Sequence, residues 1–145
     1  MISIPLRATP QALRKPTHPI VARREALRAY TALALMAECK ARREEWVDLA
    51  DQCNVAEALA SMGKIDSETA QPKIAAAIAG LVVAIRCPDG MMQMGPAIAA
   101  MREVVSMVDD ALQRFSVQTL TDAMALVRSR IYAAKADPSV TVVEG

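Results

Sequence analysis

The stretch Ile74-Ala-Ala-Ala-Ile-Ala-Gly-Leu-Val-Val-Ala-Ile85 decides the fold, because twelve residues without a polar side chain lie here between Lys73 and Arg86. As a helix the stretch is about 18 Å long, too short to cross the ~30 Å hydrocarbon core of a bilayer. A helix that is apolar on every side must be covered on every side. We therefore expect it at the centre of a helical bundle, or covered in part by a second subunit.

The flanking residues set the expected bounds of this helix. Pro72 suits a first helical position, and Cys87-Pro88-Asp89-Gly90 combines a stop with a turn. Length and alanine content favour a helix over a strand, although Leu81-Val82-Val83 is β-prone. The sequence predicts a buried central helix over about 72–87.

The composition is that of one folded domain. A chain of 145 residues with 53% hydrophobic and 23% charged residues excludes wholesale disorder. Aromatic residues make up only 3%, so alanine, leucine, valine, isoleucine and methionine must fill the core. The formal net charge of +1 gives no global attraction to nucleic acid or to an anionic membrane.

The cysteines and the N-terminus indicate a cytoplasmic protein. Cys39, Cys53 and Cys87 are odd in number and far apart, which suits buried thiols in a reducing compartment better than a disulfide framework. The first twenty residues lack the apolar run of a secretory signal, so we do not expect export.

Residues 1–19 form a basic arm interrupted by prolines. With the start of the next segment, five cations precede the first acid, Glu25: Arg7, Arg14, Lys15, Arg23 and Arg24. One interpretation is a solvated, poorly ordered terminus. The other is an arm that contacts phosphate or an acidic partner surface, and these five residues are its candidate contacts.

A helical pattern extends from about Pro19 to Arg43. Its apolar positions recur at three- and four-residue steps, at Leu27, Tyr30, Ala34 and Ala37, with Leu33 and Met36 widening the stripe. The charged run 40–45 follows, and the pattern leaves open whether the helix bends or continues there.

Segment 46–63 loosely resembles a helix-turn-helix. Trp46, Leu49, Ala50 and Cys53 are helically spaced, but the apolar phase shifts by about half a turn at Val55. Asn54 with Glu57 fits a capping box and Gly63 a stop, which predicts a break and a short second helix. One long helix with two buried faces is the alternative. As a DNA reader the second helix is poorly equipped, because its candidate contacts Ala56, Glu57, Ala60, Ser61 and Lys64 include no Arg or Gln.

The C-terminal half contains the most regular pattern. Spacings of three and four residues run through Ile98, Met101, Val105, Val108, Leu112 and Phe115, and again through Leu120, Met124, Val127, Ile131 and Ala134. Ser116 and Thr119 supply capping hydroxyls between the two runs. We expect helices over about 96–115 and 120–135, folded as an antiparallel hairpin. Met91, Met92 and Met94 are placed in a loop before it, packed at the bundle's end or forming an adaptable binding lip.

The motifs of catalysis are few. The sequence has no Gly-rich phosphate loop, no paired cysteines and a single histidine, His18, without a ligand or carboxylate at suitable spacing. We predict no enzymatic activity, no cofactor and no metal.

One family resemblance concerns the first 60 residues. The arm Lys15-Pro16-Thr17-His18-Pro19, a long helix, and then Trp46-Val-Asp-Leu-Ala-Asp51 resemble small uncharacterised helical proteins of proteobacterial prophages and mobile elements. The resemblance implies a bacterial mobile-element context and no mechanism.

The sequence thus predicts an all-α bundle of four or five helices over 20–136, between the arm 1–19 and a frayed tail 137–145. The expected function is non-catalytic protein–protein contact, with a second copy of the chain or another protein as partner. The alternative is a small nucleic-acid-binding regulator that uses the basic arm and segment 46–63.

Overall fold

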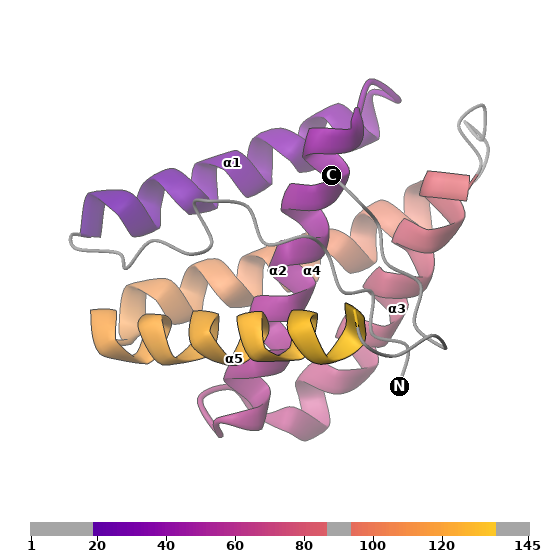
Figure 1. Cartoon of the computed structure of the whole chain (residues 1–145). Coiled ribbons are helices and arrows are strands. Elements are labelled where there is room, and N and C mark those ends of the chain that lie inside the picture. The colour runs from indigo at the N-terminus through magenta and orange to yellow at the C-terminus, as the bar shows by residue number, and fades with distance from the viewer. Residues whose placement is uncertain (1–18, 87–93, 136–145) are drawn as a thin grey trace.

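The computed structural model describes residues 19–86 and 94–135, which form five α-helices and no strand. The helices are α1 (Pro19–Ala37), α2 (Arg43–Ser61), α3 (Ser67–Arg86), α4 (Met94–Arg114) and α5 (Val117–Lys135) (Figure 1). The predicted all-α bundle is confirmed. The predicted tail 137–145, and the arm 1–19 up to residue 18, lie outside the described residues.

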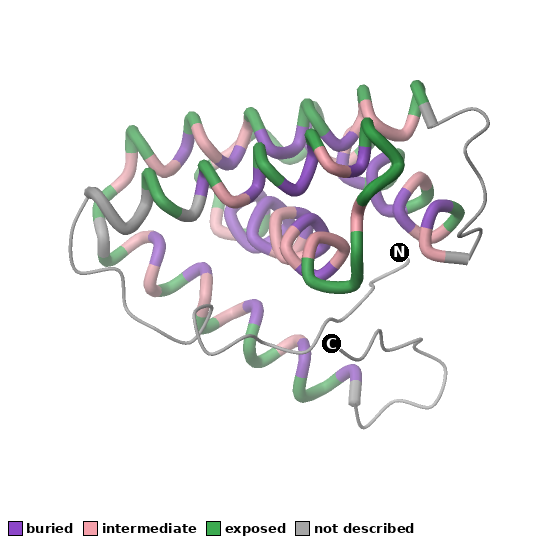
Figure 2. The backbone as a smooth tube through the Cα atoms, turned by 90° about the horizontal axis from the view of Figure 1, so that it is seen from above, coloured by how far each residue is buried: buried purple, intermediate pink, exposed green. Residues whose placement is uncertain are grey.

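α2 is the helix around which the others pack. It crosses α1, α4 and α5 in Figure 1 and packs against all four other helices. Seen from above in Figure 2, it stands nearly end-on in the middle of the molecule. From Val55 to Ala60 every residue of α2 is buried. The shift in apolar phase at Asn54 therefore marks two buried faces of one continuous helix, and the predicted break at Asn54 is wrong.

The buried face of α1 is an alanine face and differs from the predicted stripe. Ala26, Ala29, Leu33 and Met36 are buried against α2 and α4, whereas Leu27 is 66% exposed. Tyr30 lies at the edge and donates a hydrogen bond to Asp109 Oδ2 on α4 at 3.2 Å. Small side chains let helices approach closely, so packing here favours alanine over the larger apolar residues that guided the sequence prediction.

α1 and α2 end in the same way. Lys40 N–H bonds Leu35 O at 2.8 Å, and the preceding residue, Cys39, has a positive φ of 58°. At the end of α2, Lys64 N–H bonds Leu59 O at 2.9 Å, and Gly63 has φ 71°. Both are Schellman endings. The first of them ends α1 before the charged run, which settles that the helix does not continue into α2.

α3 begins at Ser67, earlier than the predicted start at Pro72. Asp66 initiates it, because its Oδ2 accepts the Thr69 N–H at 3.2 Å and the Thr69 hydroxyl proton as well. The bond from that hydroxyl lowers the pKa of Asp66. Pro72 lies inside the helix, where it leaves the Glu68 carbonyl without the usual partner four residues on.

Within one chain, α3 is covered on one side only. Its buried positions are Ala70, Ile74, Ala77, Ile78, Leu81 and Ala84, and all of them except Ile78 follow a 4-3-4-3 spacing. The opposite face is exposed. Of the two sequence expectations for this helix, complete burial in the bundle is therefore not met, and cover by a second subunit stays a prediction.

α4 and α5 form the predicted C-terminal hairpin, but with its arms apart. The seam residues Met101, Val105 and Val108 are buried as expected. The arms run in opposite directions, and α2 passes between them and packs against both (Figures 1 and 2). α4 starts at Met94, so Gly95 and Pro96 belong to its first turn and not to a loop. Met91 and Met92 lie outside the described residues.

Candidate functional site

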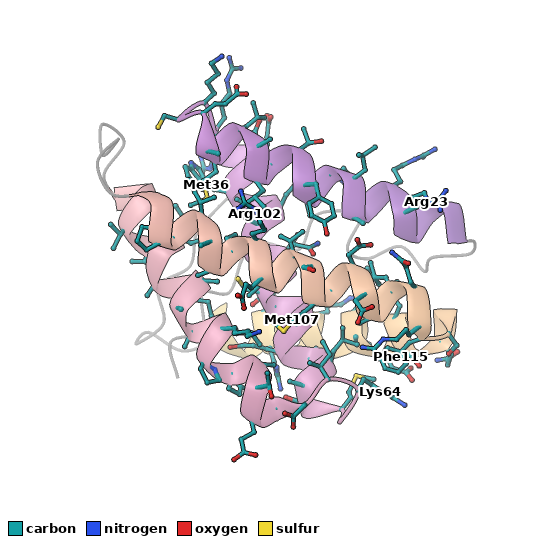
Figure 3. The ribbon with its side chains drawn as sticks, turned by 180° about the vertical axis from the view of Figure 1, so that it is seen from behind. Arg23, Met36, Lys64, Arg102, Met107 and Phe115 are labelled. Carbon is teal, nitrogen blue, oxygen red and sulfur yellow. The ribbon has the colours of Figure 1, made fainter. Side chains whose placement is uncertain are left out.

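Two of the five predicted arm contacts lie in the described part of the chain. Arg23 and Arg24 are both exposed near the start of α1, and Figure 3 shows Arg23 at the end of the helix away from Met36. Arg7, Arg14 and Lys15 lie outside the described residues. The structure therefore places two cations of the predicted patch side by side in sequence on one accessible helix end.

The helix-turn-helix interpretation of 46–63 is wrong. The segment has no turn between its halves, because α2 continues to Ser61. Of the candidate base contacts, Ala56, Glu57 and Ala60 are 0%, 3% and 5% exposed. A helix buried in this way cannot enter a major groove, so any contact with nucleic acid would have to use other residues.

The exposed side of α3 includes an uncharged face between Pro72 and Val83. Pro72, Ala76, Ala79 and Val83 follow a 4-3-4 helical spacing and are all exposed, and Ala75 is exposed beside them. Val83 is 62% exposed and is the largest of these side chains. We call these five residues the α3 outer face. The ion pair between Lys73 Nζ and Glu103 Oε2, at 2.8 Å, links α3 to α4.

A polar cluster lies where α5 packs on α2. Glu57 and Ser61 on α2 and Arg130 on α5 form it, and Asn54 lies one turn before Glu57 on the same side of α2. We call these four residues the α2–α5 polar cluster. Arg130 Nη2 donates to Ser61 Oγ at 2.7 Å. Three other atoms of the cluster are buried without a hydrogen-bond partner: Asn54 Nδ2, Glu57 Oε1 and Arg130 Nη1. Each buried polar atom without a partner costs about 1–3 kcal/mol of stability.

Glu57 is the acidic residue of this cluster. Burial raises the pKa of its carboxyl, and the nearby guanidinium of Arg130 acts in the opposite direction. The two groups are close enough to interact electrostatically but do not form an ion pair. This contact could not be predicted from the sequence, since Asn54 and Glu57 at i and i+3 match the pattern of a helix start.

The two described cysteines differ in environment. Cys53 is buried as predicted, with Sγ 3.9 Å from Met101 Sδ, and burial raises the pKa of its thiol far above the usual range. An unreactive, structural thiol is the expected consequence. Cys39 is exposed, contrary to the expectation of buried thiols, because it lies in the turn that ends α1.

In residues 19–86 and 94–135, no three His, Cys, Asp or Glu side chains gather as metal ligands would. One helix segment, Ser67–Ile85, is long and apolar enough to cross a membrane, and a third of it is buried in the bundle. No protein-family model, no curated protein and no solved structure shows significant similarity to this chain.

Proposed function

We propose that the protein acts through protein–protein contact, as a homo-oligomer that forms through the α3 outer face. The observation that supports this is the pair of opposite seams on α3. One seam, through Ile74 and Leu81, is buried in the bundle, and the other, through Ala76 and Val83, has smaller apolar side chains and faces outward. A helix with two apolar seams is suited to two packing partners.

A second copy is the partner that this face fits best. The face carries no charge that would need an opposite charge across an interface, and its small side chains permit two helices to pack about 8–10 Å apart. Two α3 helices related by a two-fold axis would meet with the same residues on both sides.

The size of the face sets the expected strength of the association. The α3 outer face spans residues 72–83, about 18 Å of a helix roughly 10–12 Å wide, so it covers about 200 Å² per copy. Stable interfaces bury about 800 Å² per partner. The α3 outer face therefore supports a weak, reversible dimer and not an obligate dimer. Residues around the face would add to the buried area.

The mass of the protein in solution, measured by sedimentation from micromolar to millimolar concentration, tests this proposal. We expect the average mass to rise with concentration toward that of a dimer and Val83→Glu to hold it at the monomer mass. Ala125→Glu, at an exposed alanine of α5, is the matched control and should behave as wild type. A wild-type chain that stays monomeric throughout, or a dimer insensitive to Val83→Glu, refutes it.

A membrane surface is the other apolar partner that α3 could meet. Vesicles of zwitterionic and of anionic lipid added to the same wild-type and Val83→Glu proteins separate the two cases. Co-sedimentation of wild type with vesicles, without self-association in their absence, would count for the membrane and against the dimer.

A second candidate function is nucleic-acid binding through the basic arm. The exposure of Arg23 and Arg24 supports it. We expect binding that weakens steeply with salt and is lost on removal of residues 1–19, with Arg23→Ala/Arg24→Ala reducing the salt slope by about two. Binding unchanged by the truncation excludes this function. The cytoplasmic location and the mobile-element context belong to the proposal and rest on the sequence alone.

A further inference from the structure

α5 is attached to the bundle almost entirely through α2. It packs against α2 and makes only marginal contact with the other helices. Its buried seam is short and contains two alanines: Leu120, Ala123, Val127, Ile131 and Ala134. Beside this seam lies the α2–α5 polar cluster, with Arg130 Nη1 and Glu57 Oε1 both buried and without partners. Of all the described helices, α5 therefore has the fewest contacts to lose when it leaves its binding surface on α2. We call this surface the α5 seat.

The connection from α4 to α5 is short. Only Phe115 and Ser116 separate the two helices. The Phe115 N–H still bonds Ala111 O at 2.9 Å, as a continuing α4 would require. Ser116 caps α5, because its Oγ accepts the Thr119 N–H at 3.3 Å. The ring of Phe115 lies beside Lys64, whose Nζ is 5.7 Å from the ring centroid (Figure 3). A change of conformation at these two residues would join α4 and α5 into one long helix.

We propose that α5 exchanges between copies, so that the α5 of one chain occupies the seat on α2 of a second chain. The binding surface is the α5-facing side of α2, with Asn54, Glu57 and Ser61, and the partner is α5 of another copy, which brings Arg130. Every α2–α5 contact of the monomer is rebuilt across the dimer, and only the hinge at Phe115 and Ser116 differs. Short hinges between elements favour this kind of exchange. The inference is independent of the α3 outer face.

Refolding at two concentrations tests the exchange. The chain with Val83→Glu is used as the parent, so that association through α3 is removed. We expect refolding at millimolar concentration to give a species of doubled mass that persists after dilution, and refolding at micromolar concentration to give monomer. Persistence is expected because the α5 helices of both copies must leave their seats before the copies can part. A parent chain that refolds only to monomer at both concentrations overturns the proposal.

Charge complementation then identifies the exchanged element. One copy carries Glu57→Lys and the other Arg130→Glu, so each alone places like charges in the cluster. In an exchanged heterodimer, one seat pairs the introduced lysine with the introduced glutamate, and the other seat is native. When the two variants are refolded together, we expect a heterodimer that contains one copy of each. When either variant is refolded alone, we expect no persistent dimer.

The single chain that carries both Glu57→Lys and Arg130→Glu is the control. It should fold, which shows that the reversed pair is accepted in the α5 seat. A parent that forms persistent dimers while the two variants form no heterodimer overturns the assignment to α5. Failure of the α3 dimer leaves both experiments unaffected, because each uses the Val83→Glu parent.

Discussion

Gly80 on α3 and Ala97 on α4 touch so closely that a Cβ atom at position 80 would lie 2.7 Å from Ala97 Cβ and 3.0 Å from its Cα. The absence of a side chain at Gly80 thus sets how closely the two helices pack. We expect Gly80→Ala to lower the free energy of unfolding by about 1–3 kcal/mol through overpacking, despite the better helix propensity of alanine.

Urea unfolding measures this loss, and Gly95→Ala is its control. A Cβ at Gly95 meets nothing within 4 Å, so the same substitution there should be neutral or stabilising by up to about 1 kcal/mol. Adding Ala97→Gly to Gly80→Ala should restore part of the lost stability. Equal effects of the two glycine substitutions would show that the helices are not held at this distance.

Two adjacent alanines on α3 should respond in opposite ways to a carboxylate. Ala77 is completely buried, so Ala77→Asp places an unpartnered charge in the core and should unfold the protein. Ala76 is exposed, and Ala76→Asp should retain the helical circular-dichroism spectrum and the cooperative melt. A folded Ala77→Asp protein would contradict the orientation of α3.

The Schellman endings of α1 and α2 make a matched pair. Cys39 holds a positive φ that disfavours residues with a side chain, and Gly63 holds the same conformation without that cost. Cys39→Gly should therefore raise the free energy of unfolding by up to about 1 kcal/mol, and Gly63→Ala should lower it by about the same amount. Thermal melts under reducing conditions provide the measurement. A destabilised Cys39→Gly would mean that its side chain makes contacts that outweigh the strain.

The raised pKa of Glu57 gives stability a dependence on pH. The carboxyl of Glu57 holds its proton more tightly in the native than in the unfolded protein. Its contribution to the free energy of unfolding is therefore fully present below the unfolded pKa of about 4.3. This contribution is lost as the pH rises through the native pKa. The difference in unfolding free energy between Glu57→Gln and wild type should therefore grow in favour of the variant over that interval. Urea unfolding at a series of pH values measures it, and a difference that stays constant would rule out this role of the carboxyl.

The helices were predictable where a regular apolar pattern met residues that start or stop a helix. Met101, Val105 and Val108 are an example, because all three lie on one face and are buried. Prediction failed where packing decided the outcome. The alanine face of α1 gives a weaker apolar signal than Leu27, yet it is the side that fits closely against the neighbouring helices.

The candidate sites were less predictable than the fold. The outward seam of α3 could be seen only as a general excess of apolar residues, because its exposure depends on which helices lie nearby. The α2–α5 polar cluster joins Ser61 to Arg130, 69 residues apart, and no local pattern contains that contact. Glu57 resembles a capping residue in sequence, and its burial follows only from the central place of α2 in the bundle.

The contact between α1 and α4 also determines when α1 can be fully packed during synthesis. Tyr30 and Asp109 are 79 residues apart, so α1 reaches the ribosome's exit long before the helix that it packs against has been made. Until α4 emerges, the face that carries Ala29 and Met36 lacks one of its two partners. A nascent chain stalled before α4 should therefore be cleaved by protease within α1, and one released after α5 should be protected there.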